Sequence, residues 1–168
     1  MNPAAKPFRR NVCVVLTDAE QRLVLVFHRI GQEWLGDPWQ FPQGGLEEGE
    51  TPEQGMRREL AEEVGSADID LLRHAPEPVR YEFPPEVVRR LEQDGSRMAR
   101  FRGQEQHWFL ARLRQGTAAI HFRHQPPEFD AFRWATPQEA VALVVPFKRA
   151  AYIRGLTALG LLADEGQG

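Results

Sequence analysis

The chain has 168 residues, 42% hydrophobic and 27% charged, with a net charge of −3, a composition that excludes a disordered protein. The longest apolar run, residues 12–16, is shorter than the roughly 20 residues of a membrane span and the roughly 7–15 of a secretory signal. Because the single cysteine, Cys13, has no internal partner, we expect it to be a small buried hydrophobe and the protein to be cytoplasmic.

The charged residues are unevenly distributed. Residues 44–63 hold seven acids and two arginines, whereas residues 89–114 hold seven arginines and three acids. Two solvated faces would explain this asymmetry. The alternative is an acidic site for cations beside a basic field for anions, which would suit a metal-assisted reaction on phosphates.

In chain order, the sequence patterning predicts alternating strands and helices. The expected strands are residues 11–16, 22–28, 39–41, 69–72, 79–83, 106–113, 119–122 and 131–135, the first two pairing as an antiparallel hairpin. The expected helices are residues 51–64, 84–93, 136–143 and 145–161. Two longer loops are expected at residues 31–38 and 94–103.

No repeat, low-complexity block or linker divides the chain, so we expect a single domain over residues 1–168. Its ordered core should run from about residue 9 to about residue 160, with a frayed tail at residues 163–168. Strands that alternate with helices, together with antiparallel hairpins, predict an α/β (α+β) fold in which helices cover a mixed β-sheet. We expect Trp108 and Trp134 in its core.

The helix at residues 51–64 has the clearest signals. Thr51 is the expected N-cap, Pro52 fits the first helical position, and Gln54 completes a capping box. Apolar side chains at every fourth position predict a buried face, namely Met56, Leu60 and Val64.

Three acids of this helix, Glu59, Glu62 and Glu63, lie at positions i, i+3 and i+4 and therefore stack on one side. Like charges at this spacing repel by roughly 0.2–0.5 kcal/mol per pair unless a cation offsets them. Hard carboxylate oxygens suit Mg²⁺ or Mn²⁺ better than zinc. A solvated acidic face is the alternative, and Arg58 can pair with Glu62 or brace a carboxylate.

The residues around this helix resemble the signature of the Nudix hydrolases: Gly44, five residues, Glu50, seven residues, then Arg58–Ser66. Every fixed position is met through Gly65, and Ser66 stands where a larger aliphatic residue is usual. Four further segments, 39–45, 103–110, 127–134 and 144–149, resemble the branch that holds bacterial RNA pyrophosphohydrolases and dinucleoside polyphosphate hydrolases. The resemblance runs from about Arg9 to Gly160.

The resemblance implies a Nudix-type α/β/α sandwich with a loop-helix-loop catalytic motif. It also implies Mg²⁺ or Mn²⁺ held by four carboxylates and one carbonyl: Glu59, Glu62, Glu63, Glu128 and the carbonyl of Gly44. Glu62 is the first choice for the general base and Glu128 the second. Glu50 is expected to brace the loop through hydrogen bonds.

Seven further residues match positions that contact substrate in the resembling enzymes. The expected phosphate contacts are Arg9, Arg29, Gln43 and Lys148. Tyr81, Val145 and Phe147 match positions that flank a nucleobase, which an aromatic face can stack. Surface exposure of the arginines and core packing of Val145 and Phe147 are the alternatives.

The implied activity is a metal-dependent pyrophosphohydrolase that cleaves a nucleotide polyphosphate. The substrate is either 5′-triphosphorylated RNA or a dinucleoside polyphosphate such as diadenosine tetraphosphate. A non-catalytic Nudix-fold nucleotide-binding regulator and a mononucleotide-sanitising pyrophosphatase are the alternatives; regulators usually have broken carboxylates, and here the set is intact. The segments 31–38 and 84–103 look longer than in the bacterial RNA enzymes, and we expect both to border the substrate. We expect no DNA-reading motif and no membrane partner, and the oligomeric state stays open.

Overall fold

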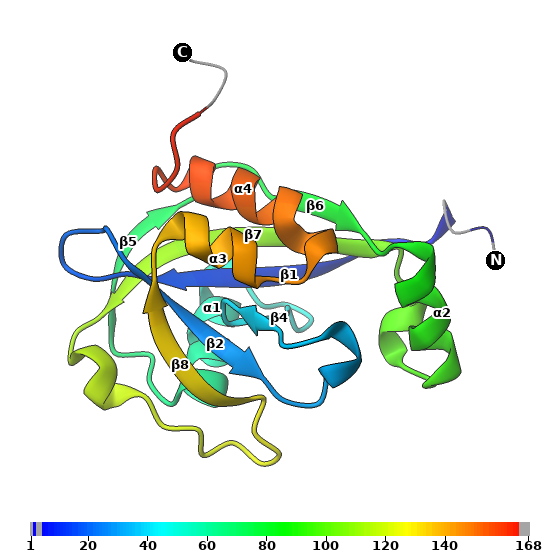
Figure 1. Cartoon of the computed structure of the whole chain (residues 1–168), viewed down its shortest axis with the longest axis horizontal. Helices are drawn as coiled ribbons and strands as arrows, with labels where there is room; N and C mark the ends of the chain where they lie inside the picture. Colours follow the sequence, from blue (N-terminus) through cyan, green and yellow to red (C-terminus); the bar gives the residue numbers. More distant parts are fainter. Residues whose placement is uncertain (1, 3–4, 165–168) are drawn as a thin grey trace.

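The computed structural model describes residue 2 and residues 5–164, and its elements are labelled in Figure 1. The strands are β1 (Phe8–Leu16), β2 (Val24–Arg29), β3 (Trp39–Gln40), β4 (Gln43–Gly45), β5 (Ile69–His74), β6 (Val79–Glu82), β7 (Gly103–Leu113) and β8 (Phe129–Ala135). The α-helices are α1 (Pro52–Glu59), α2 (Pro85–Gln93), α3 (Pro137–Leu143) and α4 (Arg149–Ala158). None of the described helices is long and apolar enough to cross a membrane. Residues 165–168 of the predicted tail lie outside the described residues.

The strands form two sheets rather than the one predicted. The first is mixed, with the order β4-β1-β7-β5 and with β6 also paired to β7; β1 and β7 run parallel, and the other pairs antiparallel. The second is antiparallel, with the order β3-β2-β8. The predicted β1–β2 hairpin is wrong, because β4 and β7 occupy both edges of β1. Only the single bridge between Thr17 and Val24 joins this segment to β2.

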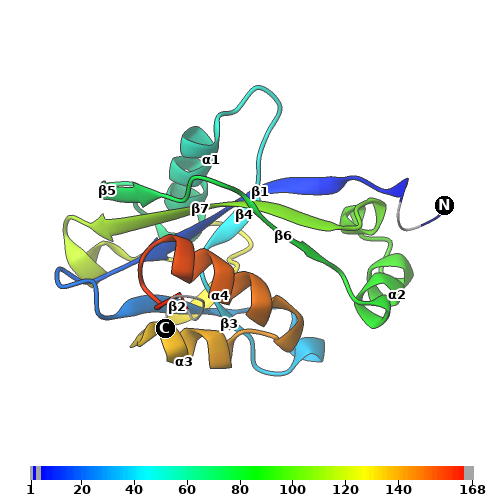
Figure 2. The same cartoon turned by 90° about the horizontal axis from the view of Figure 1, so that it is seen from above.

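Helices cover both faces of the sheets, as a sandwich requires, and Figure 2 shows α1 on one side and α3 with α4 on the other. The alternation along β1 explains this arrangement. Val12, Val14 and Leu16 enter the cluster that packs against α1, whereas Cys13 and Val15 enter the cluster on the α3–α4 side. The α+β class, the mixed sheet and the burial of Cys13 are thus confirmed.

The helix that carries the acids ends in a π-helical turn, Leu60–Val64. The predicted capping box at Thr51 and Gln54 is present. Gly65 ends the turn with φ of 99°, and a Cβ there would overlap the backbone of His121. The predicted apolar face of the helix is fully buried: Met56, Leu60 and Val64.

Two further predictions are wrong. Residues 119–122 form no strand, because Gly116–Ala119 is a 3-10 turn and the amide of His121 donates to the carbonyl of Val64 at 2.8 Å. Trp134 is 39% exposed on the edge strand β8, whereas Trp108 is fully buried as expected. The predicted terminal helix begins as a 3-10 turn, Pro146–Lys148, before α4.

Candidate active site

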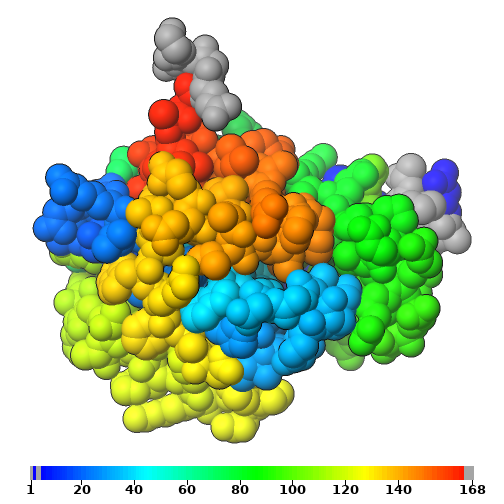
Figure 3. All heavy atoms as spheres, in the orientation of Figure 1, coloured from blue at the N-terminus to red at the C-terminus, as the bar shows by residue number. Residues whose placement is uncertain are grey.

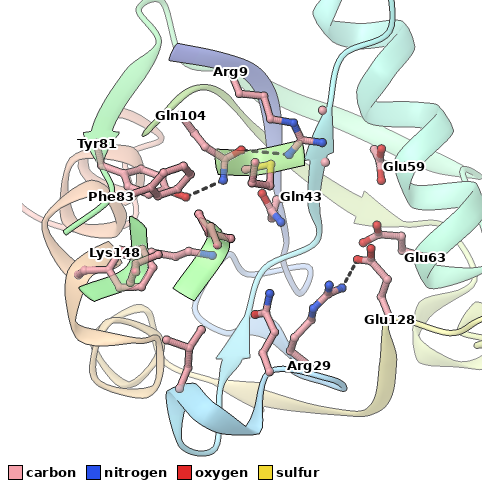
Figure 4. A pocket seen from close by; sticks show the side chains of 18 of the residues that line it. Arg9, Arg29, Gln43, Glu59, Glu63, Tyr81, Phe83, Gln104, Glu128 and Lys148 are labelled. Carbon is pink, nitrogen blue, oxygen red and sulfur yellow. Dashed lines mark hydrogen bonds and ion pairs between the residues drawn. The ribbon is translucent and has the colours of Figure 1, made fainter. Parts of the chain in front are cut away.

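A cavity of about 290 Å³ opens between the two sheets, the end of the acid-bearing helix, the segment 31–38 and α2 (Figure 4). The structure brings ten of the predicted site residues to its wall: Arg9, Arg29, Gln43, Gly44, Glu59, Glu63, Tyr81, Glu128, Phe147 and Lys148. Four predicted residues, Glu50, Arg58, Glu62 and Val145, are not part of its lining.

One wall of the cavity is acidic. Glu59 and Glu63 are only 6% and 7% exposed, and Figure 4 shows Glu128 reaching toward Glu63 from the segment before β8. Burial raises the pKa of Glu63 to about 11, and the neighbouring carboxyls of Glu128 and Glu59 add to this effect. Burial also raises the pKa of Glu59, although Arg58 opposes the shift. Carboxyls placed this way need either a shared proton or a cation.

Two glycines let charged groups lie directly against the backbone of β4. A Cβ on Gly44 would overlap the carboxyl group of Glu59, and a Cβ on Gly45 would overlap the guanidinium of Arg9. The Gly-Gly pair of the motif is therefore a steric requirement, since any side chain here would displace a charged group from the cavity.

Arg58 ties the acidic helix to the preceding loop. Its Nε and Nη2 donate to the two carboxylate oxygens of Glu50 at 2.7 and 2.9 Å, and Nη2 also donates to the carbonyl of Gly45 at 2.9 Å. Its Nη1 donates to Glu59 at 2.8 Å. The bidentate ion pair between Arg58 and the carboxylate of Glu50 lowers the pKa of Glu50. Through these contacts Arg58 connects Glu50 and the carbonyl of Gly45 to Glu59.

Glu62 lies on the outer side of the same helix. Its side chain is 41% exposed and its carboxylate is 3.4 Å from Nη1 of Arg58. The side chain of Glu62 therefore does not line the cavity.

A chain of side-chain amides lies at the floor of the cavity, and two of them, Asn11 and Gln104, had no predicted role. The side-chain amide of Asn11 donates to Gln43 at 2.5 Å and to Gln104 at 2.6 Å. Gln104 in turn donates to the hydroxyl of Tyr81 at 2.7 Å and accepts from Arg9 at 3.3 Å. Asn11 and Gln104 sit on apolar central strands, and an amide at such a position is the signal that could have found them.

Cations face the acids across this floor. Arg29 Nη1 lies 2.5 Å from Glu128 Oε2. Burial lowers the pKa of Arg9. Burial also lowers the pKa of Lys148 to about 8, so that its ammonium is poised to gain from an anion entering the cavity.

The remaining wall is apolar and comes from β6, the turn Pro146–Lys148 and the segments 31–38 and 84–103. The ring of Tyr81 is 6.1 Å from that of Phe147, and Phe83 packs at 6.0 Å from Tyr81. The two long segments line the cavity with side chains that the sequence did not single out: Gln32, Trp34, Leu35, Val87, Leu91 and Met98. Val145 lines a neighbouring groove instead.

The residues present fit a divalent cation. Within residues 5–164 no three Asp, Glu, His or Cys side chains form a ready-made metal cage, since Arg58 and Arg29 hold Glu59 and Glu128. However, Glu63 Oε2 is buried and receives no hydrogen bond, and all the donors are hard oxygens of the kind that Mg²⁺ or Mn²⁺ prefers.

Comparison with known proteins identifies the family. The model of the NUDIX domain matches residues 7–156, and the chain therefore belongs to the Nudix family. An RNA pyrophosphohydrolase of Erythrobacter litoralis is 45% identical over 86% of each chain. One of Teredinibacter turnerae is 40% identical over 90% of this chain and 85% of its own. The solved Ap4A hydrolase binary complex from C. elegans has the same fold, with a TM-score of 0.59 at 16% identity over 90% of this chain and 96% of its own.

Family membership gives the class of reaction. The protein is a Nudix hydrolase that acts on phosphoric anhydrides, and enzymes of this family generally need a divalent metal ion. The predicted membership of the Nudix family and the predicted enzyme class are confirmed.

Proposed function

We propose that this enzyme hydrolyses the anhydride between the α and β phosphates at the 5′-triphosphate end of RNA, which releases pyrophosphate and leaves a 5′-monophosphate. The observation that carries this proposal is the cavity in which Glu59, Glu63 and Glu128 converge opposite Arg29 and Lys148. RNA is favoured over a dinucleoside polyphosphate because the relatives at 40–45% identity are named RNA pyrophosphohydrolases, whereas the Ap4A hydrolase shares the fold at 16% identity.

The acidic wall would hold Mg²⁺ or Mn²⁺ through the Gly44 carbonyl and the carboxylates of Glu59, Glu63 and Glu128. Glu62 shares Nη1 of Arg58 with Glu59 and would contribute its carboxylate only from the edge of the site, outside the cavity. Bound there, the cation would neutralise the polyphosphate and lower the pKa of the attacking water. Arg58 and Glu50 would hold the helix and the loop in register, because second-sphere contacts fix the orientation of ligands.

The proton of the attacking water needs an acceptor inside the cavity. Glu128 lines the cavity and Glu62 does not, so we assign the base to Glu128, the second choice of the sequence analysis. A base must lie within hydrogen-bond reach of the proton that it removes. Arg29 holds the Glu128 carboxylate in the cavity at 2.5 Å.

Arg9, Arg29, Gln43 and Lys148 would contact the phosphates, since they surround the cavity opposite the acids. Phe147, with Val145 beside it, would stack the first base that follows the reacting phosphates. Tyr81 is 8% exposed and its hydroxyl is held by Gln104, which favours a supporting role beneath that base. The activity would belong to a single domain, residues 1–168, and the protein would act in the cytoplasm.

The test is turnover of a short 5′-triphosphorylated oligoribonucleotide with Mg²⁺, analysed for 5′-monophosphorylated product. Diadenosine tetraphosphate and a mononucleoside triphosphate are assayed in parallel, with excess chelator as the control. Preferred turnover of the RNA supports the proposal. A higher kcat/KM for diadenosine tetraphosphate or for the mononucleotide would show that this compound, and not RNA, is the preferred substrate.

A further inference from the structure

A second hollow of about 570 Å³ continues from the active-site cavity between the 3-10 turn Glu33–Leu35 and helix α2. The two hollows share four side chains, namely Trp34, Leu35, Val87 and Phe147. In the space-filling view the sky-blue segment around residue 35 and the green α2 lie next to each other on one face (Figure 3). Anything that leaves the cavity on this side passes between them.

An exposed aromatic side chain and two arginines line this groove. Trp34 is 38% exposed, which is unusual for an indole, and the guanidinium of Arg90 lies 5.2 Å from the centre of its ring. Arg90 Nε also donates to Asp94 at 2.9 Å, so the guanidinium is held in place above the ring. Arg89 is exposed one residue earlier on the same helix.

The chemistry of the groove suits a single-stranded nucleotide chain. A base stacks on an indole face whatever its sequence, and arginine forks bind phosphate oxygens. Two arginines and one acid, Glu86, line the groove; Arg90 is paired with Asp94, so the exposed guanidinium of Arg89 is the group that most favours an anion. Only RNA places further phosphates beyond the reacting end, because a dinucleoside polyphosphate ends in its second nucleoside.

We propose that this groove binds the RNA nucleotides downstream of the reacting end, with a base on Trp34 and the following phosphates on Arg89 and Arg90. This inference rests on the proposed function, since it names the path that the same substrate takes away from the cavity. Trp34 and the two arginines are thereby specificity residues, remote from the anhydride that is cleaved.

The first test uses triphosphorylated oligoribonucleotides of two, four and eight nucleotides. For the wild type, kcat/KM should rise once the chain is long enough to enter the groove. Trp34→Ala should lower kcat/KM for the longer RNAs about tenfold and abolish the rise, the size of effect expected for one lost base–aromatic stack. Trp34→Phe should restore most of it. Trp134→Ala removes an equally exposed indole far from the groove, 39% against 38%, and should leave every value unchanged.

The second test measures the salt dependence of kcat/KM for the eight-nucleotide RNA. Arg89→Ala combined with Arg90→Ala should make the slope of log kcat/KM against log salt concentration less steep by about one, because fewer counterions are released from a single strand. Arg112→Ala combined with Arg114→Ala makes the same change of charge at the other end of the molecule, where both pair with Asp70, and should leave the slope unchanged.

If these variants lose as much kcat/KM on diadenosine tetraphosphate as on RNA, the inference is overturned. The groove would then bind the second nucleoside of a dinucleoside polyphosphate. A wild-type kcat/KM that does not depend on RNA length, or a Trp34→Ala variant with unchanged kcat/KM for the longer RNAs, would also overturn it. Either result leaves the proposed function intact as long as triphosphorylated RNA is turned over. No turnover of RNA by the wild type would instead contradict the proposed function itself.

Discussion

The acidic wall and the apolar wall of the cavity are built in opposite ways. The acidic wall comes mostly from one short stretch of chain, residues 44–63; Glu59 and Glu63 are buried there, and Arg58 holds Glu59. The apolar wall is assembled from segments far apart in the sequence, and Trp34 is exposed to solvent at its edge. The first wall can carry out the step common to all anhydride substrates, whereas the second can discriminate between them.

The largest expected effect is on the acidic wall. Glu63→Gln keeps the size of the side chain and removes its charge, so it should lower kcat by about 10²–10³-fold on every substrate, with an unchanged fold. Excess chelator should lower activity equally. Glu48→Gln, an exposed acid of the same motif, is the matched control. Full activity of Glu63→Gln would show that the acidic wall takes no part in the reaction.

The identity of the base can be sharpened with two variants. Glu128→Gln should lower kcat by about 10²-fold, since the proton acceptor is lost. Glu62→Gln should lower kcat much less, because Glu62 lies outside the cavity. The reverse pattern would return the role of base to Glu62.

Lys148 should show opposed effects on activity and stability. Lys148→Met should lower kcat/KM about tenfold at pH 7, because a charged contact to phosphate is lost. It should also raise the melting temperature, since burial depresses the pKa of Lys148 to about 8 and the folded state then binds its proton less well than the unfolded state. This gain should be complete below pH 8 and disappear as the pH rises to about 10.4, the unfolded value.

Differential scanning calorimetry over this pH range checks the sign of the effect. A Lys148→Met variant that is less stable than the wild type at pH 7 would show that the ammonium has a stabilising partner. Such a partner would offset the effect of burial, and the pKa of Lys148 would then not be depressed.

The smallest expected effect is on stability at Glu62. Its contact with Arg58 is an exposed i,i+4 ion pair at 3.4 Å, whereas its charge raises the pKa of Glu59 by repulsion. Glu62→Gln should therefore leave the free energy of unfolding without Mg²⁺ equal or higher by about 0.5 kcal/mol. It should also reduce the stabilisation that Mg²⁺ gives. A clear loss of stability without Mg²⁺ would make Glu62 a structural partner of Arg58.

The two walls also differ in how well the sequence predicts them. The positions of Glu59, Glu63, Gly44 and Arg58 follow from local spacing, because a capped helix and a glycine turn set their geometry over about 20 residues. The parallel pairing of β1 with β7 depends on contacts almost a hundred residues apart, so local patterning predicted a β1–β2 hairpin instead.

The same reason explains which site residues were missed. Gln104 joins the site only because β7 lies beside β1, and Trp34 does so only because the segment 31–38 folds toward α2. Gln104 lies in the matched segment 103–110 but was not singled out there, and Trp34 lies outside every matched segment. Helix capping and alternation along strands could predict the elements and the α+β class, but not which segments meet across the cavity.

The separation of chemistry from specificity is tested most directly by one ratio: kcat/KM for an eight-nucleotide triphosphorylated RNA divided by kcat/KM for diadenosine tetraphosphate. It is measured for the wild type, Glu63→Gln and Trp34→Ala. The account predicts that Glu63→Gln lowers both values and leaves the ratio within about twofold of the wild type, whereas Trp34→Ala lowers the ratio about tenfold. A ratio that changes in Glu63→Gln and not in Trp34→Ala would contradict it.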